Sequence, residues 1–157
     1  MSRRKKTRIV QEPPLFKQFK PAGVPARILK RINISVGEYE ALRLADYEGL
    51  SHLEAAKKME ISRPTFTRLI DRARNKIATA LIEGKEIFFH GGNFKFLRDL
   101  IKCMDCGEIS RSKNVKKILE ECPYCSSEEV VYLNQQFRGR QGRGGRRRGG
   151  GGRHGRR

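Results

Sequence analysis

Two pairs of cysteines near the end of the chain restrict its fold more than any other feature of the sequence. Each pair has the form Cys-x2-Cys, and fifteen residues separate the pairs. This is the spacing of a zinc ribbon, in which each pair forms a tight turn that directs two thiolates at one ion. Four thiolates complete a tetrahedral site and leave no position for a substrate, so the pattern predicts one structural Zn2+. The predicted ligands are Cys103, Cys106, Cys122 and Cys125.

An iron or iron–sulfur site, a redox dithiol and disulfides are the alternatives to zinc. The N-terminal segment "MSRRKKTRIV" is basic, but no apolar segment follows it as a secretory signal requires. A run of roughly eighteen apolar residues is also absent, so no membrane contact is expected. We therefore expect a cytoplasmic, nucleoid-associated protein, and disulfides are rare in that compartment.

The excess of positive charge lies at the two ends of the chain. The formal net charge is +18, and residues 1–34 and 138–157 contribute +9 each, so the segment between them is neutral. Basic ends on a neutral centre are typical of arms that hold a polyanion. The alternative is that the charge only keeps the protein soluble, but solubility needs less charge and is better served by acidic residues.

Three serines predict the starts of three helices in the neutral centre. Two of them precede a glutamate by three residues, which is the spacing of a capping box. The third precedes a proline in the first helical turn, where a missing N–H costs nothing, and a glycine follows as a stop. These residues are Ser35 with Glu38, Ser51 with Glu54, Ser62 with Pro64, and Gly84.

The second and third helices, with a tight turn between them, match a helix-turn-helix in which the later helix enters a major groove. The span is "HLEAAKKMEISRPTFTRLID", residues 52–71. Residues 63–76 carry five bases and one acid, whereas residues 38–60 carry six acids and three bases. This asymmetry favours docking by the third helix. The predicted contacts to double-stranded DNA are Ser62, Arg63, Thr65, Thr67, Arg68, Asp71 and Arg72.

These residue types suit base recognition. Arginine binds the O6 and N7 of guanine bidentately, and threonine can hydrogen-bond a base or touch the thymine methyl group. The free N–H groups at the start of a helix can bind a phosphate. The alternative is a three-helix core with a charged exterior, which helical periodicity alone does not exclude. The turn spacing, the capping boxes and the charge asymmetry favour DNA.

Three stretches of the sequence resemble the UPF0251 family, also called domain of unknown function 134. They are "FKPAGVP", "EYEALRLADYEGLSHLEAAKKMEISRPTFTRLIDRARNKIATALIEGK" and the "GG" that follows, roughly within residues 13–95. Members are predicted DNA-binding proteins with a helix-turn-helix similar to region 4 of sigma factors of the sigma-70 type. The resemblance implies DNA binding and transcriptional control without a known target. Members usually have glycine at the position of Glu60, where the turn needs a positive φ that costs other residues about 1–2 kcal/mol.

The expected fold is mainly α, with a three-helix helix-turn-helix domain, then a small β-hairpin and zinc-ribbon domain, and disordered basic termini. Two apolar runs around Gly91-Gly92-Asn93 predict the hairpin. The expected segments are a disordered basic arm (1–12), a strap rich in proline and phenylalanine (13–34), the helix-turn-helix domain (35–84), a β-hairpin connector (85–97), the ribbon (98–137) and a disordered Arg/Gly-rich tail (138–157).

Two functions fit these features. The first is a sequence-specific DNA-binding regulator, with which a homodimer and a contact to the transcription machinery are compatible. The second is an RNA-binding protein that uses the ribbon and the tail, with the three helices as a scaffold. The tail holds nine arginines and nine glycines, a composition that binds phosphate backbones without reading sequence. An enzyme is not expected, because the sequence offers no carboxylate pair, nucleophile–base set or phosphate-binding loop.

Overall fold

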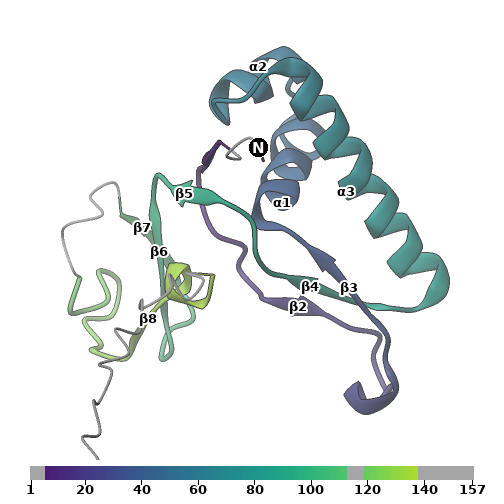
Figure 1. Ribbon diagram of the computed structural model, residues 1–157. Coiled ribbons are helices and arrows are strands. Elements are labelled where there is room, and N and C mark those ends of the chain that lie inside the picture. The colour runs from purple at the N-terminus through teal and green to yellow at the C-terminus, as the bar shows by residue number, and fades with distance from the viewer. Residues whose placement is uncertain (1–5, 113–118, 138–157) are drawn as a thin grey trace, which may run out of the picture.

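The computed structural model describes residues 6–112 and 119–137, and it combines three α-helices with small β-sheets (Figure 1). The α-helices lie within residues 35–84, which we call the trihelical unit. The helical segments are α1 (Val36–Leu42), its π-helical continuation η2 (Arg43–Tyr47), α2 (His52–Lys58) and α3 (Arg63–Glu83), with 3-10 turns η1 (Ala26–Ile28) and η3 (Leu133–Gln136).

Each α-helix begins at the predicted serine. The side chains of Ser35 and Ser51 accept hydrogen bonds from the backbone three residues later, and both capping boxes are complete. Ser62 likewise accepts from the N–H of Thr65, at 3.4 Å. Gly84 ends α3 with φ of 63°, a left-handed conformation in which glycine carries no steric penalty.

The strands form three sheets. One pairs β1 with β5, a second has the order β2-β4-β3, and a third has the order β7-β6-β8. The strands are β1 (Arg8–Val10), β2 (Gln18–Phe19), β3 (Arg31–Ile34), β4 (Glu86–Phe89), β5 (Phe94–Phe96), β6 (Asp99–Cys103), β7 (Ile109–Ser112) and β8 (Val130–Tyr132).

The trihelical unit is the connection between two parallel neighbouring strands. β3 enters it, β4 leaves it, and the two pair in parallel from Arg31 opposite Glu86 to Ile34 opposite Phe89. Parallel strands need a long crossover, and here the three helices supply it. Segment 26–34, part of the expected strap, contains the 3-10 turn η1 followed by β3.

The predicted β-hairpin at 85–97 is wrong. β4 and β5 do not pair with each other, because β3 and β2 occupy the two edges of β4. β5 pairs instead with β1, in parallel. The expectation that residues 1–12 are disordered is also wrong for part of that arm, because residues 8–10 are β1 and Val10 is completely buried. Residues 1–5 lie outside the described part of the chain.

Two hydrophobic cores lie on the two sides of α1. The first joins the three helices through buried residues such as Leu44, Met59 and Phe66. The second joins α1 to the strands through Val10 and Phe89, among others. With strands forming the second core, the fold contains three α-helices and small sheets, and the expected mainly α class describes it only in part.

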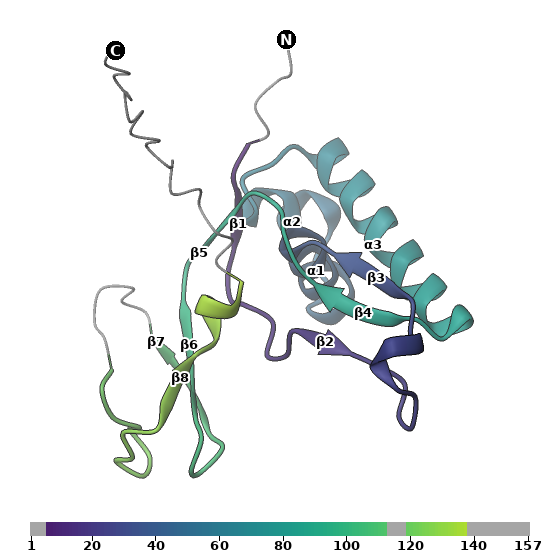
Figure 2. The ribbon, with the colours of Figure 1, turned by 60° about the horizontal axis from the view of Figure 1, so that its bottom comes forward.

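The third sheet carries the cysteines and lies on the side of the molecule away from α3 (Figures 1 and 2). Two hydrogen bonds connect this sheet to the end of β1. The N–H groups of Leu97 and Arg98, just before β6, donate to the carbonyls of Val10 and Gln11. Residues 128–134, within the expected ribbon, contain β8 and the start of η3. The tail at 138–157 lies outside the described residues. In the part of the chain that the structure describes, none of the helices has both the length and the apolar character that a bilayer crossing requires.

Candidate nucleic-acid interface and metal centre

The turn between α2 and α3 has the backbone conformation that the sequence predicted. Glu60 has φ of 54°, in the left-handed region. The N–H of Ile61 then returns to the carbonyl of Ala56, at 3.0 Å, and Met59 is completely buried beneath the turn. α2 and α3 therefore meet at a fixed angle, with Phe66 of α3 buried between them.

The first two turns of α3 present polar side chains to solvent. Arg63, Thr65, Arg68 and Asp71 are all exposed, whereas Phe66 and Leu69 between them are buried. Neither Arg63 nor Arg68 forms an ion pair with any residue that the structure describes. Two cationic side chains are thus available on this face for an external anion or a base edge.

The remaining predicted DNA contacts already have partners within the protein. The Thr67 hydroxyl lies 3.0 Å from His52 Nδ1, and Thr67 is half-buried. Arg72 lies at a long distance, 3.9 Å, from the carboxylate of Glu38. The hydroxyls of Ser62 and Thr65 lie 2.8 Å apart at the start of the helix. The seven predicted residues therefore form one surface, but they are not equally free.

Several cations cluster around Glu38, for which the sequence predicted only a capping role. The buried Glu38 carboxylate accepts from Lys76 at 2.8 Å and from the N–H of Ser35. Arg8 lies close by, with its Cδ 2.9 Å from the place where a Cβ on Gly37 would be. Burial, and then the charge of Arg72, lower the pKa of Arg8. Three cations thus surround one carboxylate beside the exposed face of α3.

His52 also makes contacts that were not predicted from the sequence. Its ring packs edge-on against Phe66, with centroids 5.4 Å apart, and it carries the hydrogen bond to Thr67. His52 thereby links α2 to α3 below the exposed face. A histidine at the second position of a helix gives no sequence signal for this contact.

The four cysteines come together at one point of the third sheet, as their spacing predicted. All four Sγ atoms lie within 4.8 Å of one another. The Sγ atoms of Cys103 and Cys125 are 3.6 Å apart, and those of Cys106 and Cys122 are 3.7 Å apart. A tetrahedral ion with metal–sulfur bonds of about 2.3 Å needs sulfur–sulfur distances of about 3.8 Å. The cluster therefore fits a single metal ion with four thiolate ligands.

Two similar turns hold the thiols in this arrangement. In each, the N–H of the residue after the second cysteine returns to the carbonyl of the first cysteine, from Gly107 to Cys103 at 3.1 Å and from Ser126 to Cys122 at 2.8 Å. Both donor residues have positive φ, 75° for Gly107 and 58° for Ser126. Glycine at the first turn adopts this conformation without a steric penalty, whereas Ser126 at the second turn does not.

Backbone N–H groups also favour ionised sulfur. The backbone hydrogen bond from Cys106, assisted by Asp105, lowers the pKa of the Cys103 thiol to about 6. Four thiols this close share protons and titrate as a set, of which Cys103 is the acidic member. A thiolate is the form that binds a metal ion, and the backbone favours it at Cys103, whereas burial and the neighbouring thiols leave the pKa values of Cys106 and Cys125 raised.

Comparison with known proteins assigns the chain to a family. Residues 1–97 match the family model described as "Protein of unknown function DUF134". The chain belongs to this family. Three relatives named UPF0251 protein come from Chloroherpeton thalassium (48% identical, covering 93% of this chain and 94% of the relative), Halothermothrix orenii (46%; 82% and 98%) and Clostridium tetani (43%; 83% and 88%). No solved structure matches the chain.

The family model and the relatives cover different parts of this DUF134 protein. The model ends at residue 97, so it includes α3 and Arg8 but not the cysteines. The match to the relative from Chloroherpeton thalassium spans 147 of the 157 residues and therefore includes the cysteine region as well. The match to this relative thus extends over both the trihelical unit and the cysteine region of this chain.

Proposed function

We propose that this protein binds double-stranded DNA in a sequence-specific manner and regulates transcription. The observation that carries the proposal is the exposure of Arg63 and Arg68 on the first turns of α3, without an ion-pair partner among the described residues. A buried or neutralised pair of arginines here would have left the first turns of α3 without an unpaired cation to read bases. In this proposal α2, the turn and α3 act as a helix-turn-helix, and the first half of α3 enters the major groove.

The exposed residues differ in the base contacts for which they are suited. Arg63 and Arg68 can each bind the O6 and N7 of a guanine, and Asp71 can accept from the N4 amino group of a cytosine. Thr65 can contact a base or a thymine methyl group. Thr67, which bonds to His52, serves better as a positioning residue than as a base contact.

The cations around Glu38 are better suited to phosphate than to bases. Arg8, Arg72 and Lys76 outnumber the one carboxylate that they share, so positive charge remains after internal pairing. They lie beside the proposed groove-entering face and on two different elements. Phosphate contacts fix the register of a protein on the duplex without reading sequence, and we assign this role to the three residues. The free N–H groups at the start of α3 would add another phosphate contact near Ser62.

For the cysteine cluster we propose one Zn2+, held by Cys103, Cys106, Cys122 and Cys125. The ion would cross-link the two turns, and with four protein ligands it would leave no position open for chemistry. The support is the pair of sulfur–sulfur distances near 3.7 Å, which match the edge of a zinc tetrahedron. We give the ion a structural role, in a sheet too small to hold a core unaided.

Selection from random duplexes, with a random RNA pool run in parallel, tests the proposal. We expect a duplex motif to emerge. Arg68→Ala should weaken binding to the selected duplex by about 5- to 150-fold, equivalent to the roughly 1–3 kcal/mol of a base contact, and weaken random duplex far less. Arg27→Ala is the charge-matched control, because Arg27 is an exposed arginine of η1.

Two outcomes would contradict the proposal. Equal losses on selected and random duplexes would reduce Arg68 to a phosphate contact. Enrichment from the RNA pool alone would favour RNA binding by the cysteine-containing sheet and the Arg/Gly-rich tail.

A further inference from the structure

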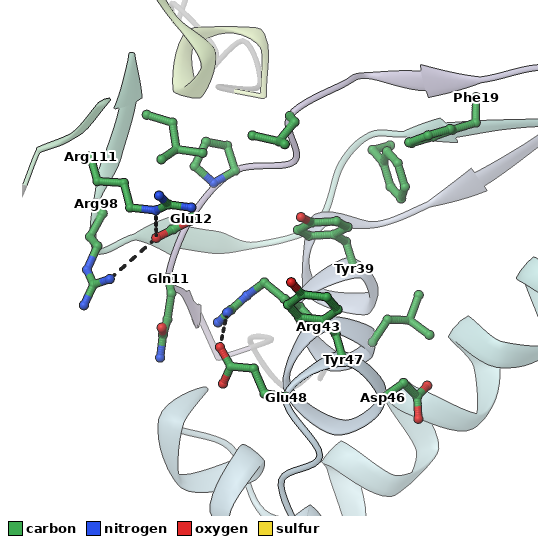
Figure 3. A pocket seen from close by; sticks show the side chains of 15 residues that line it. Gln11, Glu12, Phe19, Tyr39, Arg43, Asp46, Tyr47, Glu48, Arg98 and Arg111 are labelled. Carbon is green, nitrogen blue, oxygen red and sulfur yellow. Dashed lines mark hydrogen bonds and ion pairs between the residues drawn. The ribbon is translucent and has the colours of Figure 1, made fainter. Parts of the chain in front are cut away.

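A cavity of about 790 Å3 lies between the trihelical unit, the chain that follows β1, and the cysteine-containing sheet (Figure 3). Its volume is within the usual range for small-molecule sites, roughly 300–1,000 Å3. It takes no part in the proposed DNA surface, because α3 contributes none of its described lining residues.

One part of the cavity wall is apolar and aromatic. Tyr39 of α1 and Phe19 of β2 both pack edge-on against Phe89 of β4, with ring centroids 5.2 and 6.0 Å away. Leu42 completes this surface from α1. Phe19 remains 54% exposed, which leaves ring surface free to contact a bound molecule. Such a wall suits an aromatic or branched apolar group.

The opposite part of the wall carries uncompensated positive charge. Glu12 lies between Arg98 and Arg111, at 3.5 and 3.0 Å, so two guanidinium groups share one carboxylate (Figure 3). Arg98 and Arg111 remain 45% and 60% exposed. Arg43, the third arginine of the cavity, is already paired with Glu40 and Glu48. Arg98 and Arg111 together therefore carry one more positive charge than the Glu12 carboxylate neutralises.

We propose that this cavity binds a small amphipathic anion. Its carboxylate or phosphate ester lies on Arg98 and Arg111, and its aromatic or apolar body lies on Tyr39, Leu42 and Phe89. Arginine is suited to such head groups, because its planar fork of N–H donors matches both carboxylate and phosphate oxygens. A cation of the same shape is excluded by the charge of the two arginines, and a neutral molecule forfeits their hydrogen bonds.

The cavity has a direct connection to α3. Asp46 of η2 lines it and also accepts two hydrogen bonds from Arg74 of α3, at 2.6 and 3.1 Å. A molecule that fills the cavity would contact η2. The Asp46–Arg74 pair connects η2 to α3, the helix that we propose binds DNA. That regulatory consequence rests on the proposed function, whereas binding of the anion does not.

Tyrosine NMR gives a local test of the binding, without DNA. The sequence has four tyrosines, of which Tyr39 and Tyr47 line the cavity, while Tyr124 and Tyr132 lie in the cysteine-containing sheet outside it. The full chain is labelled with 13C-tyrosine and titrated with benzoate, phenyl phosphate, benzyl alcohol and benzylamine. We expect saturable shifts at Tyr39 and Tyr47 with benzoate or phenyl phosphate, and at least 10-fold weaker effects from the alcohol and the amine. The stronger of the two acids identifies the head group.

Variants test the role of the arginines. Arg111→Ala should weaken binding of the preferred acid at least 10-fold, Arg111→Lys should restore part of it, and Arg27→Ala, which removes a charge elsewhere, should change little. Unchanged resonances of Tyr124 and Tyr132 verify that the fold is intact. Equal shifts at all four tyrosines, equal binding of benzyl alcohol, absence of saturation, or no effect of Arg111→Ala would each overturn the proposal. Because no DNA is present, failure of the DNA proposal would not affect these results.

Discussion

Glu60 and Ser126 occupy a backbone region in which glycine is the favoured residue. Their φ angles are 54° and 58°, and both stand at turns that shape a proposed site. In this region a side chain costs about 1–2 kcal/mol, whereas a glycine costs roughly 0.5–1 kcal/mol in lost chain entropy. The balance favours glycine at both positions.

Glu60→Gly should therefore stabilise the protein. We expect the free energy of unfolding to rise by about 0.5–1 kcal/mol, as the difference between the steric and entropic costs. Urea denaturation, monitored through the helical circular dichroism signal, measures this free energy. The matched control is Lys57→Gly, an exposed position inside α2, which should instead lose about 1 kcal/mol. A loss in Glu60→Gly would show that the glutamate side chain makes a compensating interaction.

At the scale of single residues, the sequence predicted what local chemistry determines. The capping serines, the left-handed Glu60 and the convergence of the four cysteines all depend on residues only a few positions apart or on a ligand spacing. The contacts of Glu38 with Lys76 and of His52 with Thr67 join residues on different helices. Nothing in the local pattern marks either pair, because their distance depends on how the helices pack.

At the scale of secondary-structure elements, β1 changes the expected role of the N-terminal segment. Val10 is fully buried in the second hydrophobic core, and β1 pairs along its length with β5. A three-residue strand gives too short a pattern to be distinguished from a disordered arm. The predicted hairpin failed for a related reason, because two adjacent apolar runs do not reveal that other strands already occupy the edges of β4.

Val10→Ala should destabilise the protein by roughly 2 kcal/mol, from lost apolar burial and the small cavity that remains. Ile9→Ala is the control, because Ile9 is only half-buried and should cost less despite the larger truncation. Thermal unfolding of both variants gives the comparison. An unchanged melting temperature for Val10→Ala would support the original expectation of a disordered arm.

The Asp46–Arg74 pair is the ionic link between η2 and α3. The hydrogen bond from Arg74 lowers the pKa of Asp46, so the pair contributes stability above the pKa of the unfolded chain, near 4. This contribution is lost as pH falls through the lower pKa of the folded state. Both side chains are partly exposed, at 41% and 46%, so solvent reduces the contribution to about 0.5 kcal/mol or less.

Asp46→Asn should accordingly lower stability by that small amount at pH 7 and have a smaller effect near pH 2, well below the pKa of the unfolded chain, where the contribution of the carboxylate is being lost. Urea denaturation at both pH values gives the two differences. Asp71→Asn, on the outer face of α3, is the control for removal of a carboxylate from the same region. A difference of the same size at both pH values would mean that the charge of Asp46 is not the source.

At the scale of the whole molecule, the trihelical unit and the cysteine-containing sheet lie on opposite sides (Figures 1 and 2). They meet through the chain after β1 and through Phe137, which is buried in the second core. The four-cysteine cluster, where we propose Zn2+, is therefore remote from the proposed DNA surface. An effect of the metal on the trihelical unit must pass through the strands between them.

Removal of the proposed metal tests whether the trihelical unit and the cysteine-containing sheet fold separately. A strong thiol-compatible chelator should release one zinc ion per chain and unfold the cysteine-containing sheet, because the proposed Zn2+ binding is part of its folding free energy. Most of the helical circular dichroism should remain, since the first core contains only residues of the trihelical unit. Metal analysis and circular dichroism give the two readouts. Recovery of two iron atoms per chain would overturn the zinc assignment, and loss of the whole helical signal would show that the two parts fold together.

The parallel pairing of β3 with β4 has a consequence for engineering. Paired strands run about 4.8 Å apart, and because β3 and β4 are parallel and four residues long, the helices leave at the end of β3 and return at the start of β4, roughly 10 Å away along the pair. Their entry and exit are close enough to be bridged by a short linker, or to be spliced into a surface loop of an unrelated host. Grafting residues 31–89 into another protein as one continuous segment would therefore carry the candidate base-reading helix with it.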